Sequence, residues 1–165
     1  MARNESFEEF YTGTVGRLLG QLFVVTGDLH EAEELVQEAF TRAAARWARL
    51  RDYDVPEAWV RRVAMNLAAD RVRGLRRHTR AMGTLRPAAE VPPVSVEALA
   101  LAEALGTLPV RQRQVLVLHY LVDLPVGEVA RTLDMPDGTV KSLLSRGRHA
   151  LAAKLGEAEE VFDPS

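Results

Sequence analysis

The stretch of sequence that decides the fold is VGEVARTLDMPDGTVKSL, residues 126–143. Its first half repeats apolar residues at helical spacing: Val126, Val129 and Leu133. Pro136 prevents that helix from continuing, and Asp134 stands where the chain must reverse, in a left-handed conformation that Asp tolerates better than most residues. Asp137 can then cap a second helix. The pattern predicts a helix-turn-helix, with helices over about 125–133 and 137–155.

The second of these helices has two unlike faces. Its apolar face carries Val140, Leu144, Gly147, Leu151 and Leu155, with Leu143 at the edge, while residues 139–156 contain no acid. In the major groove of DNA, Arg can fork to guanine, and Ser or Thr can reach bases and phosphates. The candidate DNA-contacting residues are Thr139, Lys141, Ser142, Ser145, Arg146, Arg148 and His149. The alternative is an ordinary amphipathic helix with a solvated polar face.

Helical spacing also dominates the rest of the chain, whereas the alternation typical of strands is nearly absent. The expected helices cover about 5–25, a stripe from Leu29 to Leu50 that Asp28 caps with Glu31, then 56–80, 97–105 and 109–121. Gly83, Pro87, Pro92 and Pro93 mark a linker. We therefore predict an all-α fold of two small helical domains, residues 1–81 and 97–156, joined by a flexible linker at 82–96 and followed by a frayed acidic tail at 157–165.

The helix expected from Pro56 is unusually basic. Residues 42–86 hold twelve Arg against four acids, whereas residues 1–41 hold two basic residues against eight acids. One arc of this helix aligns Arg62, Asn66, Ala69, Arg73 and Arg76, with Arg77 nearby. Small Ala69 would let a nucleic-acid backbone or base come close, and the polar loop at 49–56 could hold an unstacked base. Solvated helix faces remain the alternative, and Trp47 and Trp59 are expected to be core anchors rather than stacking platforms.

Several classes of function are disfavoured. The chain has no Cys, so disulfide frameworks and thiolate metal sites are excluded, and its four His lie near no carboxylate cluster. No apolar run is long enough to cross a bilayer, and no secretory signal is visible. Nucleophile elbows and glycine-rich phosphate loops are missing too. We expect a cytoplasmic protein that is not an enzyme, with no catalytic residues, cofactor, metal or membrane insertion.

Two groups of motifs, in the right order, resemble a known family. EAEELVQEAF at 31–40 and VAMNLAADR at 63–71, with Pro56 and Trp59 before it, look like the second conserved region of bacterial sigma factors. LPVRQRQV at 108–115 and GTVKS at 138–142, followed by Ser145 and Arg146, look like the fourth region. Two such regions with a short linker are the pattern of the extracytoplasmic-function (ECF) group. The resemblance covers about residues 5–155.

The resemblance implies a dissociable initiation subunit of RNA polymerase. Glu34, Gln37, Glu38 and Phe40 would face the polymerase clamp coiled coil. The basic helix and the loop at 50–56 would engage and open the minus-ten promoter element, and the helix at 139–148 would recognise the minus-thirty-five element. Core RNA polymerase, through its clamp coiled coil and flap region, and promoter DNA are the expected partners, and an anti-sigma factor is a candidate partner.

Two positions depart from the family pattern. Asp134 replaces the usual turn glycine, and Leu143 stands where an Arg is common, which removes one expected DNA contact. Two rival functions remain open. One is a stand-alone helix-turn-helix regulator, which would need residues 1–80 to dimerise or bind a ligand. The other is a helical interaction adaptor, for which both basic faces would be incidental.

Overall fold

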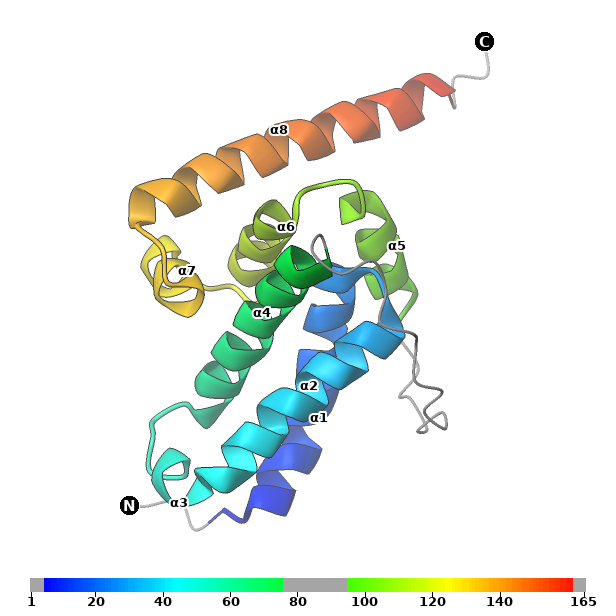
Figure 1. The fold of residues 1–165 in the computed structure, drawn as a ribbon. Helices are drawn as coiled ribbons and strands as arrows, with labels where there is room; N and C mark the ends of the chain where they lie inside the picture. The colour runs from blue at the N-terminus through cyan, green and yellow to red at the C-terminus, as the bar shows by residue number, and fades with distance from the viewer. Residues whose placement is uncertain (1–4, 76–94, 162–165) are drawn as a thin grey trace.

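The computed structural model describes residues 5–75 and 95–161, and these two ranges contain only helices, turns and loops. The first domain comprises α1 (Phe7–Thr26), α2 (Leu29–Ala45), α3 (Trp47–Leu50) and α4 (Pro56–Leu75). The second comprises α5 (Val96–Leu105), α6 (Val110–Leu116), the π-helical turn η1 (Val117–Leu121), α7 (Val126–Leu133) and α8 (Asp137–Val161). This arrangement confirms the all-α class (Figure 1). The expected linker at 82–96 lies mostly outside the described residues.

The first two helices begin and end at clear local signals. The Ser6 hydroxyl oxygen accepts from the Glu9 N–H, and the Glu9 carboxylate accepts from the Ser6 N–H, each at 3.2 Å, which forms a reciprocal cap that sequence reasoning missed. Gly27 ends α1 with a φ of 71°, a conformation that favours glycine. The predicted cap at Asp28 is confirmed, because its carboxylate accepts from the Glu31 N–H at 3.1 Å.

The apolar stripe from Leu29 to Leu50, expected on one helix, is divided between two helices. Helix α2 ends at Ala45, and α3 starts at Trp47 after Arg46 leaves helical geometry, with a φ of −116°. The break allows the Trp47 ring to stack on Phe10, with ring centroids 4.9 Å apart and planes 26° apart, and it leaves Leu50 buried. Aromatic packing therefore overrides the local helical pattern here. Trp47 is a core anchor, as predicted.

The helix-turn-helix forms as predicted, with three corrections to its surroundings. Asp134 is left-handed, with a φ of 53°. Helix α8 begins at Asp137 itself, so this residue is in the first turn instead of preceding it. The same helix continues to Val161, so the start of the expected frayed tail is helical. The helix expected over 109–121 changes to a π-helical turn at Val117.

A close helix crossing explains one small residue of α8. A Cβ added to Gly147 would lie 2.9 Å from Leu116 Cδ1, so only glycine lets α8 approach α6 this closely without a shift of Leu116. The apolar pattern placed Gly147 correctly on the buried side of α8. Leu143 is half-buried at the edge of that face, and Val140 and Leu144 are buried.

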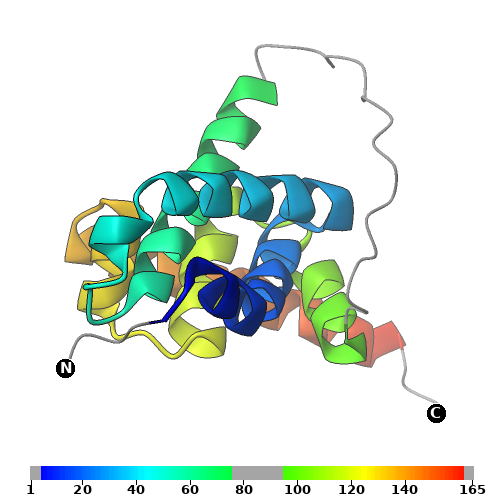
Figure 2. The ribbon, with the colours of Figure 1, turned by 90° about the horizontal axis from the view of Figure 1, so that it is seen from below.

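The two domains share one hydrophobic core. Helix α1 packs against α2 and α4 in its own domain and against α5 and α6 in the second, while α4 packs against α6 and α7 (Figures 1 and 2). Leu22 and Val25 of α1 are fully buried. Helix α4 is consequently covered on more than one side, and Val60, Ala64 and Met65 are all fully buried. The domains therefore lie against each other in this structure.

Candidate nucleic-acid interface

The predicted recognition face of α8 is open to solvent. The exposed members are Thr139, Lys141, Ser145, Arg146, Arg148 and His149, and Ser142 is half-buried. The Arg146 guanidinium donates to the Ser142 hydroxyl at 3.0 Å. The two residues are one helical turn apart, and the bond holds the guanidinium on the exposed side of α8. No acidic side chain occurs between residues 139 and 156 to neutralise this face. The arrangement can present several cationic and hydroxyl donors to a polyanion.

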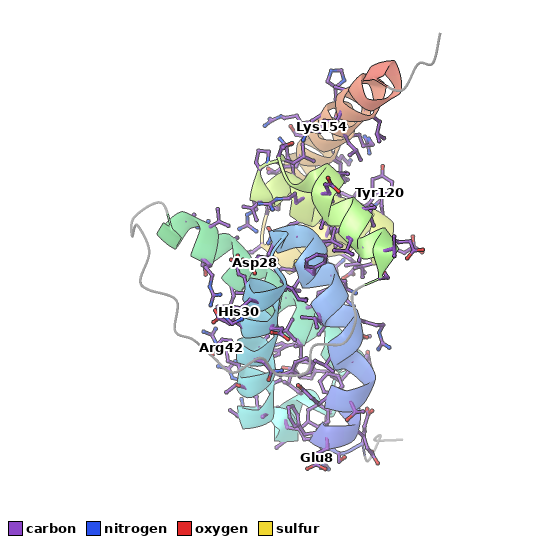
Figure 3. All side chains as sticks on the ribbon, turned by 90° about the vertical axis from the view of Figure 1, so that its right-hand side faces the viewer. Glu8, Asp28, His30, Arg42, Tyr120 and Lys154 are labelled. Carbon is purple, nitrogen blue, oxygen red and sulfur yellow. The ribbon has the colours of Figure 1, made fainter. Side chains whose placement is uncertain are left out.

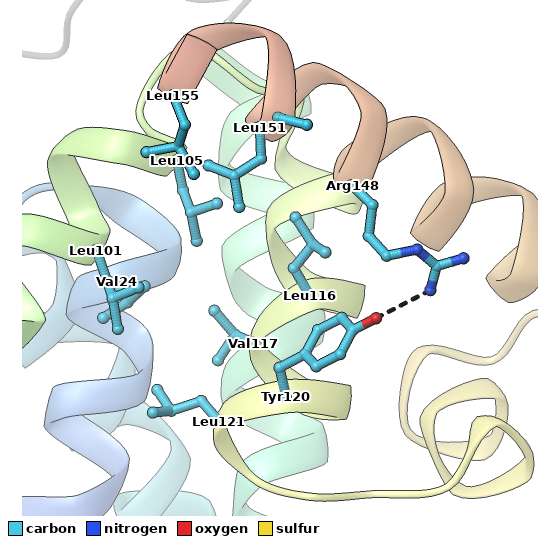
Figure 4. Close-up of a pocket in the computed structure, with 11 residues that line it drawn as sticks. Val24, Leu101, Leu105, Leu116, Val117, Tyr120, Leu121, Arg148, Leu151 and Leu155 are labelled. Atoms are coloured by element: carbon cyan, nitrogen blue, oxygen red, sulfur yellow. Dashed lines mark hydrogen bonds between the residues drawn. The ribbon is translucent and has the colours of Figure 1, made fainter. Parts of the chain in front are cut away.

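Arg148 differs from Arg146 because its partner lies outside α8. Its Nη1 donates to the Tyr120 hydroxyl of η1 at 3.0 Å (Figure 4). The contact ties α8 to the π-helical turn. Tyr120 was not among the predicted site residues, because no sequence pattern announces a bond between residues 28 positions apart.

The predicted face of α4 is divided by the second domain. Arg62 is exposed, and Arg73 is exposed with its guanidinium paired to Asp70 on the same helix. Asn66 is half-buried, and its Nδ2 donates to the Thr132 carbonyl of α7 at 3.2 Å. Ala69 is 2% exposed, so the expectation that it offers an open surface is wrong for this arrangement. Arg76 and Arg77 lie outside the described residues.

Another Arg of α4, Arg61, is buried and is bonded to side chains of α1 and α4. Arg61 is 8% exposed; its Nε donates to Gln21 Oε1 at 3.1 Å, and its Nη2 lies 3.7 Å from Glu57 Oε1. Burial lowers the pKa of Arg61, and the nearby carboxylate of Glu57 opposes that shift. Arg17 of α1 makes a two-point contact with the same carboxylate, at 3.1 and 3.2 Å. These bonds hold α4 against α1.

A cavity of about 520 Å³ lies beside the loop predicted to hold an unstacked base. Its walls include Arg46, Arg49, Tyr53 and Trp59. The Arg46 guanidinium carbon lies 5.7 Å from the Trp59 ring centroid, and Tyr53 is 52% exposed. Aromatic and guanidinium faces are the surfaces on which nucleobases stack. Trp59 packs against the hydrophobic core, as predicted, and also lines this cavity.

The acidic face of α2 is largely engaged within the first domain. The Glu34 carboxylate accepts from Arg71 Nη1 of α4 at 2.9 Å and contacts His30 Nε2 at 3.3 Å. Gln37 Nε2 donates to the Tyr11 hydroxyl at 2.7 Å. Figure 3 shows α2 along one side of the molecule, with Asp28, His30 and Arg42 following one another down the helix.

Two members of the predicted polymerase-facing set differ in their surroundings. Glu38 is exposed and pairs with Arg42 one turn away, with Glu38 Oε1 and Arg42 Nε 3.1 Å apart. Phe40 is 2% exposed and packs edge-on against Tyr11, with ring centroids 4.8 Å apart. The prediction that Phe40 lies on an exposed partner-binding face is therefore wrong. An aromatic side chain in an amphipathic helix gains more free energy from the core than from solvent exposure.

A polar contact between the domains was missed entirely. Gln114 of α6 is completely buried, and its Nε2 donates to the Met65 carbonyl of α4 at 2.6 Å. Its Oε1 accepts from Arg111 Nη1 at 3.0 Å. In the sequence, Gln114 sits in the alternating run RQRQ and has the appearance of a surface residue. Only the partner helix, 49 residues away, makes the amide a core group.

Two Arg side chains near Gln114 are partly removed from water at the boundary between the domains, and nearby carboxylates do not fully offset the cost of burying their charge. Burial lowers the pKa of both Arg111 and Arg113, and the nearby Arg73 lowers that of Arg111 further, while Asp70 and Glu31 act in the opposite direction on Arg111 and Arg113 respectively. Burial also raises the pKa of Glu31 on α2, which faces Arg71 and Arg113. Arg113 Nε is buried and has no hydrogen-bond partner among the described residues. The boundary between the domains thus contains charged groups that solvent would stabilise better.

An apolar groove of about 450 Å³ opens between α1, α5, α6, η1 and α8 (Figure 4). Val24 of α1 forms one wall. The second domain supplies the others, among them Leu101, Leu105, Leu116 and Leu155, with Tyr120 and Arg148 also at the groove. Leu155, placed on the apolar face of α8, is thus exposed and lines this groove.

Residues 5–75 and 95–161 offer neither a metal site nor a membrane span. This part of the chain brings together no group of three or more His, Asp or Glu side chains that could hold a metal ion. None of its helices combines the length and apolarity that spanning a membrane requires.

Comparison with known proteins gives matches over both domains. Residues 10–78 match the family described as Sigma-70 region 2, and residues 98–151 match Sigma-70, region 4. The ECF RNA polymerase sigma factor SigW of Bacillus subtilis is 31% identical over 152 residues, which cover 78% of each chain. The RNA polymerase sigma-E factor of Streptomyces coelicolor is 29% identical over 151 residues, covering 90% of this chain and 85% of the relative.

Solved structures give similar matches. The sigma factor RpoE of Bartonella quintana, solved in complex with the anti-sigma factor NepR, matches with a TM-score of 0.68 at 22% identity, over 91% of this chain and 96% of that one. CnrH, solved in complex with the cytosolic domain of CnrY, matches with a TM-score of 0.57 at 26% identity, over 92% of this chain and 88% of that one. The likeness extends over both domains.

Proposed function

Because this chain belongs to the ECF sigma factors of RNA polymerase, we propose that it directs core polymerase to promoters with α8 and α4 as its two DNA-binding helices. The observation that carries the assignment of residues is the exposed, acid-free face of α8 behind a left-handed turn at Asp134. This face reads the minus-thirty-five element in the major groove, with Arg146 as the side chain best placed to fork to a base. Lys141 and the hydroxyls of Thr139 and Ser145 contribute phosphate contacts.

The first domain engages and opens the minus-ten element. Arg62 and Arg73 supply cationic contacts to the backbone, and the cavity beside Tyr53 and Trp59 receives a base that has left the stack. Unstacking a base costs about a few kcal/mol, and stacking it between an aromatic ring and a guanidinium offsets that cost. Opening of this kind needs no nucleotide hydrolysis. We accordingly assign the chain no catalytic reaction of its own.

Core polymerase binds the exposed part of α2. Gln37 and Glu38 carry this assignment, and Glu34 contributes through the part of its carboxylate that Arg71 and His30 leave free. A second protein partner is an anti-sigma factor, by likeness to RpoE and CnrH, which were solved with NepR and CnrY. A protein that works with polymerase acts in the cytoplasm. The comparisons give no support to a stand-alone regulator.

Glu38→Lys tests the polymerase face. We expect it to weaken association with core polymerase about tenfold or more, because it replaces an exposed negative charge at a charge-complementary interface. Thermal stability should change little, since Glu38 makes only an exposed contact with Arg42. Glu34→Lys would be harder to interpret, because it also removes the bond to Arg71 between α2 and α4. Affinity is measured by titrating labelled protein with core enzyme.

The matched control for this prediction is Glu103→Lys, which makes the same charge change on an exposed residue of α5. It should leave core affinity unchanged. Equal core affinity of wild-type protein and Glu38→Lys would remove this part of α2 from the interface.

Run-off transcription with core polymerase tests the function as a whole. The protein alone should bind duplex promoter DNA weakly, and protein plus core enzyme should start transcripts at discrete positions in a genomic template library. A library that yields no promoter-directed transcript would contradict the proposed function.

A further inference from the structure

The second domain covers the middle of the predicted DNA-binding face of α4, while Arg62 and Arg73 on the same face stay exposed. Asn66 donates to the Thr132 carbonyl of α7, and Ala69 lies three residues further along the same face and is buried. DNA cannot reach these two positions while α6 and α7 remain against α4. The structure therefore represents a closed form of the protein.

One buried side chain links the two domains in this closed form. The Gln114 amide donates across the boundary to the Met65 carbonyl at 2.6 Å. That carbonyl is in the middle of α4, and a carbonyl oxygen has a second lone pair that can accept a bond from outside the helix. On its other side, Gln114 accepts from Arg111, which belongs to its own helix. The amide N–H thus bonds to the first domain only when the domains touch, whereas the bond to the amide oxygen lies within α6.

The closed boundary also contains groups that favour separation. Arg113 Nε is buried with no partner in the described residues, and the guanidinium of Arg111 is near the like charge of Arg73. Separation would return the guanidinium groups of Arg111 and Arg113 to water, which stabilises their charge better than the buried boundary does. These charged groups therefore weaken a contact between the domains that is otherwise largely apolar.

We propose that Gln114 is a latch that holds the free protein in an autoinhibited form, in which the second domain covers Asn66 and Ala69 in the middle of the minus-ten-binding face of α4. This inference rests on the proposed function, because it takes α4 as a promoter-binding helix. The latch opens when the protein assembles with core polymerase and promoter DNA. Asn66 belongs to the closed contact and to the DNA-binding face at once, so it exchanges the Thr132 carbonyl for DNA.

Gln114→Glu is the sharpest test of the latch. Glutamate has the same shape and keeps an oxygen for Arg111, but its second oxygen would face the Met65 carbonyl oxygen where the amide now donates. The variant therefore replaces one attractive contact between the domains with a repulsive one. We expect the ratio of open to closed protein to rise about tenfold or more. Gln112→Glu adds the same charge to a half-buried residue of the same helix and is the matched control.

Opening is measured by energy transfer between two dyes. The chain contains no Cys, so cysteines introduced at Glu8 and Ala153, both exposed and in different domains, are the only labelling sites. Lys154, the residue after Ala153 in the sequence, lies at the opposite end of the molecule from Glu8 in Figure 3. The second readout is the affinity for a labelled pool of single-stranded DNA oligonucleotides of random sequence, measured by fluorescence anisotropy.

The expected result is a changed transfer efficiency and several-fold tighter DNA binding for Gln114→Glu, despite its added negative charge, with neither effect in Gln112→Glu. Unchanged transfer in Gln114→Glu would overturn the latch. Changed transfer without tighter DNA binding would overturn its inhibitory role. If Gln114→Glu fails to fold, Gln114→Ala removes the same bond without a charge and should shift both readouts in the same direction. Run-off transcription by the wild-type protein separates these outcomes from a failure of the proposed function.

Discussion

Leu22→Ala is expected to destabilise the folded chain by about 2–5 kcal/mol, the range for removing a fully buried leucine side chain and leaving a cavity. Leu22 is fully buried on α1, the helix that packs against both domains. The loss should therefore be felt by the second domain as well as by the first. Urea denaturation followed by circular dichroism should show one cooperative transition, shifted to lower urea.

The control for this prediction is Gly16→Ala on the same helix. Gly16 is exposed, and an added Cβ would meet no atom within 4 Å. Alanine should therefore raise stability by up to about 1 kcal/mol, through helix propensity alone. Two separate transitions, with only one of them shifted by Leu22→Ala, would contradict a shared core.

Arg146→Ala is expected to reduce promoter selectivity by about 1–3 kcal/mol at one base pair, if its guanidinium forks to that base. The bond to the Ser142 hydroxyl positions the guanidinium on the exposed face of α8. The substitution therefore removes a group that is already oriented to contact a base. The measurement is transcription by the holoenzyme from promoters that carry every single-base change in the minus-thirty-five element.

Lys141→Ala provides the contrast on the same helix. Lysine acts as a point charge toward phosphates, so its removal should weaken binding to all these promoters nearly equally and should reduce the salt dependence. If Arg146→Ala also weakens all promoters equally, Arg146 is a phosphate contact and the reading face of α8 must be assigned to other side chains.

The parts of the fold that could be predicted are those with local causes. The reversal at Asp134 follows from a residue that tolerates left-handed geometry close to a proline, and the start of α2 follows from the Asp28 side chain. The helical spacing of apolar residues predicted the buried face of α8 correctly, with Val140 and Leu144 in the core. The family resemblance rested on two motif sets and is confirmed by matches to both sigma regions.

The parts that could not be predicted depend on contacts between distant residues. Helix α4 shows one apolar face in the sequence, and its second covered face exists only because α6 and α7 pack on it. The period of α2 suggested one helix to Leu50, but the stacking of Trp47 on Phe10 ends it earlier. Phe40 belongs to a family motif, but it is buried because its ring packs against the rings of Phe7, Phe10 and Tyr11.

The π-helical turn at Val117–Leu121 sets the direction in which the Tyr120 side chain leaves the helix. A π turn holds about one residue more than an α turn, and each residue of an α-helix rotates the next by about 100°. If the same residues formed a regular α-helix, the larger rotation at each residue would carry the Tyr120 phenol to another side of the axis. Arg148 of α8 would then lose its hydrogen bond to the Tyr120 hydroxyl. The wider turn thus determines where the Arg148 guanidinium is held beside α8.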